Sequence, residues 1–144
     1  MRFINKIIIH CTATTPTQDI GVAEIRKFHV EHNHWRDIGY HYVVRRDGKV
    51  ERGRYISQPG SHCRGYNSHS IGIAYVGGLD EHRHPADTRT PAQKAALKKL
   101  IWKLVAMTGA YVFGHRDFAN KACPSFDART EYQELASKAR NLKK

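Results

Sequence analysis

Two histidines and one cysteine are the residues of this sequence best suited to hold a metal ion. His10 follows an isoleucine-rich segment, His115 follows the short apolar segment 111–113, and Cys123 lies eight positions after His115. Zinc binds imidazole nitrogen and thiolate sulfur in a tetrahedral arrangement, and a catalytic zinc keeps one position for water. Two imidazoles and one thiolate would therefore supply the three protein ligands of a catalytic zinc site.

The spacing of these residues leaves other interpretations open. The sequence has no Cys-x-x-Cys pair, so a core histidine and an inert buried thiol are also compatible with it. A thiol hydrolase with Cys123 as nucleophile and His115 as its base is a further possibility. The other two cysteines, Cys11 and Cys63, bring the total to three, which is too few and odd for a disulfide framework. Whether Cys11 and Cys63 bond to each other stays open at this point.

Strands and helices must bring the candidate ligands together. The pattern of apolar and turn residues predicts strands over 3–9, 40–45, 49–52, 71–76 and 111–113. It predicts helices over about 20–33, from 91 to the glycine at 109, and over about 128–140. The Asp47-Gly48 pair is typical of a hairpin turn between the second and third strands. Strands that alternate with helices indicate an α/β fold with a central mixed sheet flanked by helices.

Two of the predicted helices carry a recognisable start. Thr90 is expected to cap the longer one, with Pro91 in its first position and Gln93 completing a capping box. The apolar stripe of that helix is expected to consist of Leu97, Leu100, Ile101 and Leu104. Asp19 is expected to cap the earlier helix, whose buried face would carry Val22, Ile25, Phe28 and His29.

Length and hydropathy restrict the class of protein. A chain of 144 residues with 40% hydrophobic and 26% charged residues predicts one globular domain, which we place over residues 1–144. The longest aliphatic run is Ile7-Ile8-Ile9, whereas a membrane span needs roughly 20 apolar residues, so no span is expected. The N-terminal segment lacks the pattern of a secretory signal, and we therefore expect synthesis in the cytoplasm without a signal peptide.

The charge of the chain is strongly positive. Its 24 Lys and Arg residues against 13 Asp and Glu residues give a formal charge of +11. Such a charge either favours an anionic partner or serves solubility alone. It is the main argument for a nucleic-acid-binding protein, but no RNP, zinc-finger or helix-turn-helix pattern accompanies it. We therefore expect no specific nucleic-acid partner.

Six segments that cover nearly the whole chain carry a resemblance to a known family. They are IIIHCTAT, GVAEIRKFH, DIGYHYVVRRDGKVERGR, GSHCRGYNSHSIGIAYVGG, TPAQKAALKKL and HRDFANKACPSFD. In this order they resemble the type-2 N-acetylmuramoyl-L-alanine amidases, in the phage-lysozyme-like branch, which are related to the peptidoglycan recognition proteins. Several dissimilar segments in the same order make the resemblance specific.

The resemblance implies a zinc-dependent hydrolase of the amide bond between N-acetylmuramic acid and L-alanine, with one Zn²⁺ per chain. It implies that His10, His115 and Cys123 are the zinc ligands. By the same resemblance, Tyr40 and Lys121 are the catalytic side chains. A mixed sheet with zinc in a surface groove is the implied fold.

Further residues are expected in contact with substrate. The resemblance implies a groove segment that contains His62 and Asn67, and His62 is alternatively a residue that organises its loop. Trp35 is expected to stack on sugar or peptide, although a tryptophan near a helix end is as often a packing residue. The implied partner is peptidoglycan or a muropeptide, and we expect the protein to be a monomer.

The enzyme would meet the cell wall after release or non-classical export, because no signal peptide is evident. A peptidoglycan-binding recognition module with little catalysis is the alternative to a hydrolase. Cys123 argues against that alternative, because the resemblance implies that such modules have lost this ligand.

Overall fold

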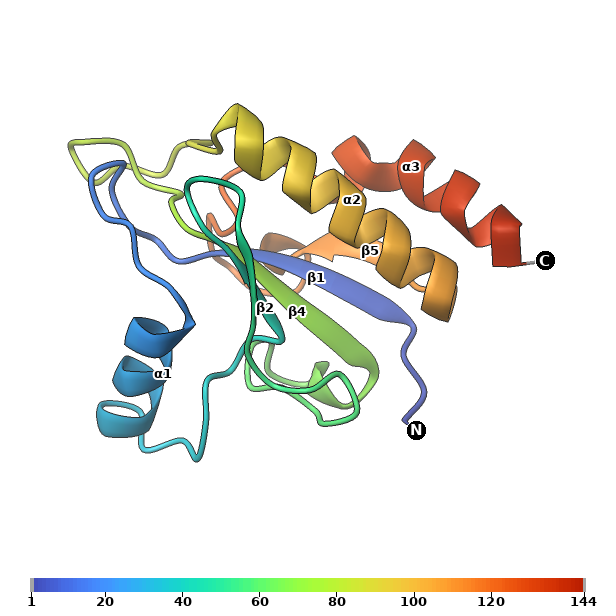
Figure 1. Cartoon of the computed structure of the whole chain (residues 1–144), viewed down its shortest axis with the longest axis horizontal. Helices are drawn as coiled ribbons and strands as arrows, with labels where there is room; N and C mark the ends of the chain where they lie inside the picture. Colours follow the sequence, from blue (N-terminus) through green and yellow to red (C-terminus); the bar gives the residue numbers. More distant parts are fainter. Residues whose placement is uncertain (1, 144) are drawn as a thin grey trace.

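The computed structural model describes residues 2–143, which surround a five-stranded sheet (Figure 1). Its strands are β1 (Lys6–Cys11), β2 (Tyr42–Val44), β3 (Val50–Arg52), β4 (Ser70–Tyr75) and β5 (Tyr111–Gly114), in the spatial order β3-β2-β4-β1-β5. The β2–β3 pair is antiparallel and the other pairs are parallel. The expected mixed sheet is confirmed.

Three helices flank this sheet. They are α1 (Val22–Glu31), α2 (Pro91–Thr108) and α3 (Ala128–Lys143). Figure 1 shows α2 and α3 side by side over the sheet, with α1 lying apart from them near β2. Val44 of β2 packs in the core beneath α2 and α3, whereas its neighbour Val43 packs with α1. Helices therefore cover both faces of the sheet, as expected for an α/β fold.

Strand β1, which lies between β4 and β5, begins and ends later than the sequence predicts. The predicted strand covers 3–9, but β1 continues through His10 and Cys11, which lie opposite Ala74 and Tyr75 of β4. Phe3 lies before the strand and is 69% exposed. Pairing with β4 extends the strand, and this long-range effect is absent from the local pattern. His10 is consequently the penultimate residue of a buried strand.

The start of α1 corrects the predicted cap. The helix begins after Gly21, whose N–H donates to Glu24 Oε1 at 2.6 Å, and Asp19 lies outside the helix. The Asp19 carboxylate lies 3.5 Å from the Arg45 guanidinium instead. Phe28 is 54% exposed, so it does not belong to the buried face. An ion pair with the hairpin thus replaces the predicted cap of Asp19.

The predicted features of α2 are confirmed. Thr90 Oγ1 accepts from Gln93 N at 3.0 Å, and Gln93 Oε1 accepts from Thr90 N at 2.9 Å. Gly109 ends the helix with a φ of 74°, in the left-handed region that favours glycine. The predicted stripe of Leu97, Leu100, Ile101 and Leu104 is buried. None of the helices within residues 2–143 is long and apolar enough to cross a bilayer.

Candidate metal centre and surface groove

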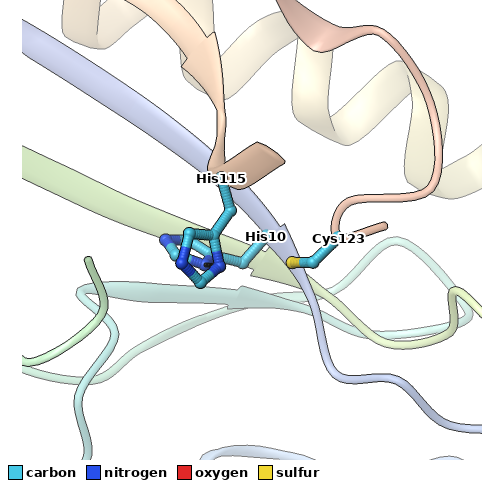
Figure 2. A group of neighbouring side chains, drawn as sticks. All are labelled: His10, His115 and Cys123. Carbon is cyan, nitrogen blue, oxygen red and sulfur yellow. Dashed lines mark hydrogen bonds between the residues drawn. The ribbon is translucent and has the colours of Figure 1, made fainter. Parts of the chain in front are cut away.

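The three candidate ligands meet at one edge of the sheet. His10 lies on β1, His115 follows the neighbouring parallel strand β5, and Cys123 lies in the loop before α3. His10 Nδ1 and His115 Nδ1 are 3.1 Å apart, and the ligand atoms of all three residues lie within 4.8 Å of one another. Figure 2 shows the two imidazole rings against each other and the Cys123 sulfur pointing toward them.

This set of donor atoms fits zinc. Zinc–nitrogen bonds of 2.0–2.1 Å place two tetrahedral nitrogen ligands about 3.3 Å apart. The separation of 3.1 Å between His10 Nδ1 and His115 Nδ1 is close to that value. Cys123 adds a sulfur donor, and His115 and Cys123 are both partly exposed. Three protein ligands at a partly exposed position are typical of a catalytic zinc site, which keeps room for water.

Small residues of β4 make room for the imidazoles. Successive side chains of a strand point to opposite faces, so Ile8 and His10 share one face of β1. Their partners on β4 are Gly72 and Ala74. A Cβ atom at Gly72 would lie 2.5 Å from Cγ of His62, which no side chain tolerates. Glycine at position 72 is therefore required by the His62 ring that packs over it.

His62 lies against His10 of the candidate metal centre. Its Nδ1 lies 2.8 Å from His10 Nε2, and its Nε2 lies 3.2 Å from Ser70 Oγ. Burial lowers the pKa of His10 and of His62, and neighbouring imidazoles lower both pKa values further. Neutral imidazole is the form that binds a metal ion, so this environment favours coordination by His10.

Burial also lowers the pKa of His41, a residue that the sequence pattern did not single out. Its Nδ1 accepts from Gly72 N at 3.0 Å, and its Nε2 lies 2.8 Å from Gln58 O. Burial lowers its pKa to about 4, and the positive charges of Arg2 and Arg54 contribute to this shift. The only signal in the sequence was its place beside Tyr40, because its role depends on pairing with β4.

The environment of Cys123 disfavours the thiol-hydrolase interpretation. Its Sγ accepts from Cys11 N at 3.2 Å and lies 3.9 Å from Cys11 O. A hydrogen bond with the Cys11 thiol and burial raise the pKa of Cys123. A catalytic thiol needs a lowered pKa, whereas a metal ion deprotonates a coordinating thiol directly. All three cysteines, Cys63 included, are free, so the possible Cys11–Cys63 bond is not formed.

A groove of about 660 Å³ opens beside the candidate ligands. It is lined by Trp35, Ser61, His62, Cys63, Arg64, Asn67, His115, Phe118, Ala119 and Lys121. The structure therefore brings the three predicted substrate-binding residues, His62, Asn67 and Trp35, to one surface with Lys121. Asn67 Oδ1 also accepts from His62 N at 3.0 Å and Cys63 N at 2.9 Å, which shapes the loop. Substrate contact by these residues stays a prediction.

Tyr40 lies beside the candidate metal centre but lines a different cavity. This second cavity, of about 500 Å³, extends along α1 and includes His29 and Phe28. The rings of Tyr40 and His10 are 5.2 Å apart between centroids. Burial raises the pKa of Tyr40 above its usual value, so its hydroxyl stays protonated at neutral pH. Tyr40 can therefore donate a hydrogen bond, while Lys121 presents an ammonium from the larger groove.

Comparisons with known proteins agree with this geometry. A family model described as N-acetylmuramoyl-L-alanine amidase matches residues 1–126. An endolysin of Klebsiella phage KP32 is 48% identical over 131 residues, covering 90% of this chain and 86% of that protein. The peptidoglycan-recognition protein SC2 of Drosophila melanogaster is 30% identical, covering 85% of this chain and 68% of that protein. The solved structure of the N-acetylmuramoyl-L-alanine amidase LysC from Clostridium intestinale superposes with a TM-score of 0.78 at 29% identity, covering 95% of this chain and 85% of that one.

Proposed function

Since the chain belongs to the N-acetylmuramoyl-L-alanine amidase family, we propose that it is a zinc-dependent hydrolase of peptidoglycan. The bond cut is the amide that joins the lactyl group of N-acetylmuramic acid to the L-alanine of the stem peptide. The observation that carries this proposal is the convergence of His10, His115 and Cys123 beside a groove. One Zn²⁺ per chain is expected.

The retained ligand set favours hydrolysis over recognition alone. Relatives of this chain include peptidoglycan-recognition proteins, so a binding module on the same fold is the alternative function. A module that only binds needs the groove but no metal ligands. Here Cys123 lies with His10 and His115 in one group, and Lys121 lines the adjoining groove. A hydrolase uses all four residues, whereas a recognition module has no need of them.

Amide hydrolysis needs an activated water and compensation for the negative charge on the carbonyl oxygen. His10, His115 and Cys123 would hold the zinc ion, which would supply activation of a water molecule and polarisation of the scissile carbonyl. The Lys121 ammonium, which is exposed in the groove, places a positive charge where the oxyanion develops. The protonated Tyr40 hydroxyl orients the attacking water or donates to the same oxygen. A phenol with a raised pKa is a poor base, so Tyr40 does not accept the proton.

The groove provides the surface for a glycan strand with its stem peptide. Trp35 offers a half-buried ring, and Asn67 and His62 line the same groove. The positive charge of the chain would draw it to an anionic cell wall. We propose that a monomer, made in the cytoplasm, acts on the wall after release or non-classical export.

The decisive experiment is digestion of purified peptidoglycan with and without a chelator. The proposal expects new free amino groups of L-alanine and soluble fragments, with no new reducing sugar ends. A chelator should stop the release, and added Zn²⁺ should restore it. Full activity in protein shown to contain no zinc would reject metal dependence. Binding to the wall without any release would favour the recognition module.

A further inference from the structure

A chain of hydrogen bonds leads away from the candidate metal centre into the interior. His10 Nε2 lies 2.8 Å from His62 Nδ1, and His62 Nε2 lies 3.2 Å from Ser70 Oγ. The Ser70 hydroxyl donates to the backbone carbonyl of Tyr66 at 2.7 Å. His10, His62 and Ser70 are at most 8% exposed, so water does not compete for these bonds.

The last acceptor in this series of hydrogen bonds determines where each proton of the series lies. The Tyr66 carbonyl can only accept, so it takes the single hydroxyl proton of Ser70. Ser70 Oγ must then accept from His62, and Nε2 of His62 carries the proton. The Nδ1 atom of a neutral His62 ring is consequently an acceptor, and it takes the proton on His10 Nε2. This leaves His10 Nδ1 without a proton.

The unprotonated nitrogen of His10 is the atom that faces the other ligands. His10 Nδ1 lies 3.1 Å from His115 Nδ1 and belongs to the group formed with Cys123. We propose that His62 is a positioning residue of the metal centre, which holds His10 in the tautomer and orientation that present Nδ1 to the metal. This inference rests on the proposed function only in requiring that the protein bind a metal ion.

The packing of His62 explains why its ring stays in this position. Cβ atoms at Gly60 and Gly72 would lie 2.7 Å and 2.5 Å from atoms of the His62 ring, so two glycines enclose it. Its backbone N–H donates to Asn67 Oδ1 at 3.0 Å. The ring is directed at His10 and Ser70, and only 8% of the residue is exposed. His62 therefore lines the groove, while its two ring nitrogens form hydrogen bonds with the buried residues His10 and Ser70.

The test is the affinity for Zn²⁺, measured by competition with a chromogenic chelator. His62→Leu removes both nitrogens with little change in volume and should weaken zinc binding roughly 10- to 100-fold, the usual loss for such a partner. His62→Asn retains an oxygen near the position of Nδ1 and should recover most of the affinity. Ser70→Ala leaves the ring in place but removes its acceptor, so a smaller loss is expected. Arg64→Ala, on the same loop, is the matched control and should bind zinc as the wild type does.

Cobalt replacement gives a second measurement that does not depend on catalysis. Co²⁺ in His62→Leu should keep the sulfur charge-transfer band of Cys123 and show altered ligand-field bands, because the orientation of His10 changes. A folded His62→Leu with wild-type zinc affinity and cobalt spectrum would overturn the inference. Equal losses in the Leu and Asn variants would also overturn it, since they would indicate packing alone. A wild-type protein that binds no zinc would instead overturn the proposed metal dependence.

Discussion

The two faces of β1 carry side chains of different chemistry. Ile7 and Ile9 point into the aliphatic core beneath α2 and α3, where apolar side chains fill the space. Ile8 and His10 point the other way, and His10 lies among imidazoles, each with a specific partner. A shift of one residue in the register would exchange these two environments.

Residues on one face of β1 stabilise the fold, whereas residues on the other face position the groups of the candidate site. The aliphatic face stabilises the fold by burying apolar surface. This contribution depends on side-chain volume and not on hydrogen-bond direction. On the face that carries His10, stability depends on the direction of hydrogen bonds, because burying a polar atom without a partner destabilises the folded state. Within residues 2–143 no buried side-chain nitrogen or oxygen lacks a hydrogen-bond partner. Substitutions on the two faces should therefore change different measured quantities.

The largest effect is expected at the sulfur ligand. Cys123→Ser should abolish both zinc binding and hydrolysis, a loss of about a thousandfold or more in kcat/KM, because a serine hydroxyl is a poor zinc ligand. Zinc content per chain and release of L-alanine amino groups would be measured together. A variant that keeps one zinc but has no activity would point to Cys123 as a nucleophile.

The next effect in size concerns the ammonium in the groove. Lys121→Ala should keep zinc and lose roughly 100- to 1,000-fold in kcat, the usual loss for one donor to an oxyanion. KM should change little, because the interaction forms mainly in the transition state. Steady-state kinetics on a soluble muropeptide, with zinc content confirmed, would test this. Near-wild-type turnover would remove Lys121 from the catalytic groups.

Lowering the pH should reduce the stability of the folded protein, because His41 becomes protonated. Its pKa is about 4 in the folded protein and 6.5 ordinarily, so the unfolded chain binds more protons between these values. Stability is full above pH 6.5 and falls as the pH drops toward 4, by about 3 kcal/mol in total for a shift of this size. Urea unfolding of metal-free protein at several pH values would measure the slope. His41→Asn should show a smaller slope, and an equal slope in both proteins would contradict the assignment.

A smaller effect is expected from one hydroxyl group. Tyr40→Phe keeps the ring beside His10 and removes only the donor. A hydrogen bond to a charged group is worth about 1.5–3 kcal/mol, which corresponds to roughly 10- to 100-fold in kcat. Zinc content and melting temperature should match the wild type. Unchanged kcat in the zinc-loaded variant would leave Tyr40 with a packing role.

The smallest effect is expected on the aliphatic face, one residue from the candidate ligand His10. Ile9 is fully buried in the core beneath α2 and α3. Ile9→Val removes one methylene group and should lower the free energy of unfolding by about 1 kcal/mol, with zinc affinity and kcat unchanged. Urea unfolding and zinc titration would show whether the two faces are independent. A loss of zinc affinity would show that they are coupled.

Local signals in the sequence predicted the parts of the fold that depend on neighbouring residues. The Thr90 cap and the Gly109 end of α2 are examples, because their hydrogen bonds form within a few positions. The family resemblance identified His10, His115 and Cys123 as candidate ligands, and the structure brings these three residues together. It did not reveal Ser70 or His41, since their roles arise only when β4 pairs with β1 and β2.

The same dependence on distance explains in part why the first helix was predicted less well. Asp19 has the residue type of a cap, but Arg45 of the following hairpin pairs with it. Phe28 has the spacing of a buried residue, yet it lies at the exposed edge of a cavity. The first error comes from a contact with a distant segment, whereas the Phe28 ring stacks on His32 at the end of its own helix.

The ligands of the candidate metal centre come from opposite ends of the chain, and this sets when activity can appear during synthesis. His10 and His115 are 105 positions apart, and Cys123 follows later still. At 5–20 residues per second, a ribosome needs about 5 to 20 s to make the stretch between the two histidines. No fragment that ends before Cys123 can assemble the three ligands. Under the proposed function, a nascent or truncated chain would therefore lack hydrolytic activity.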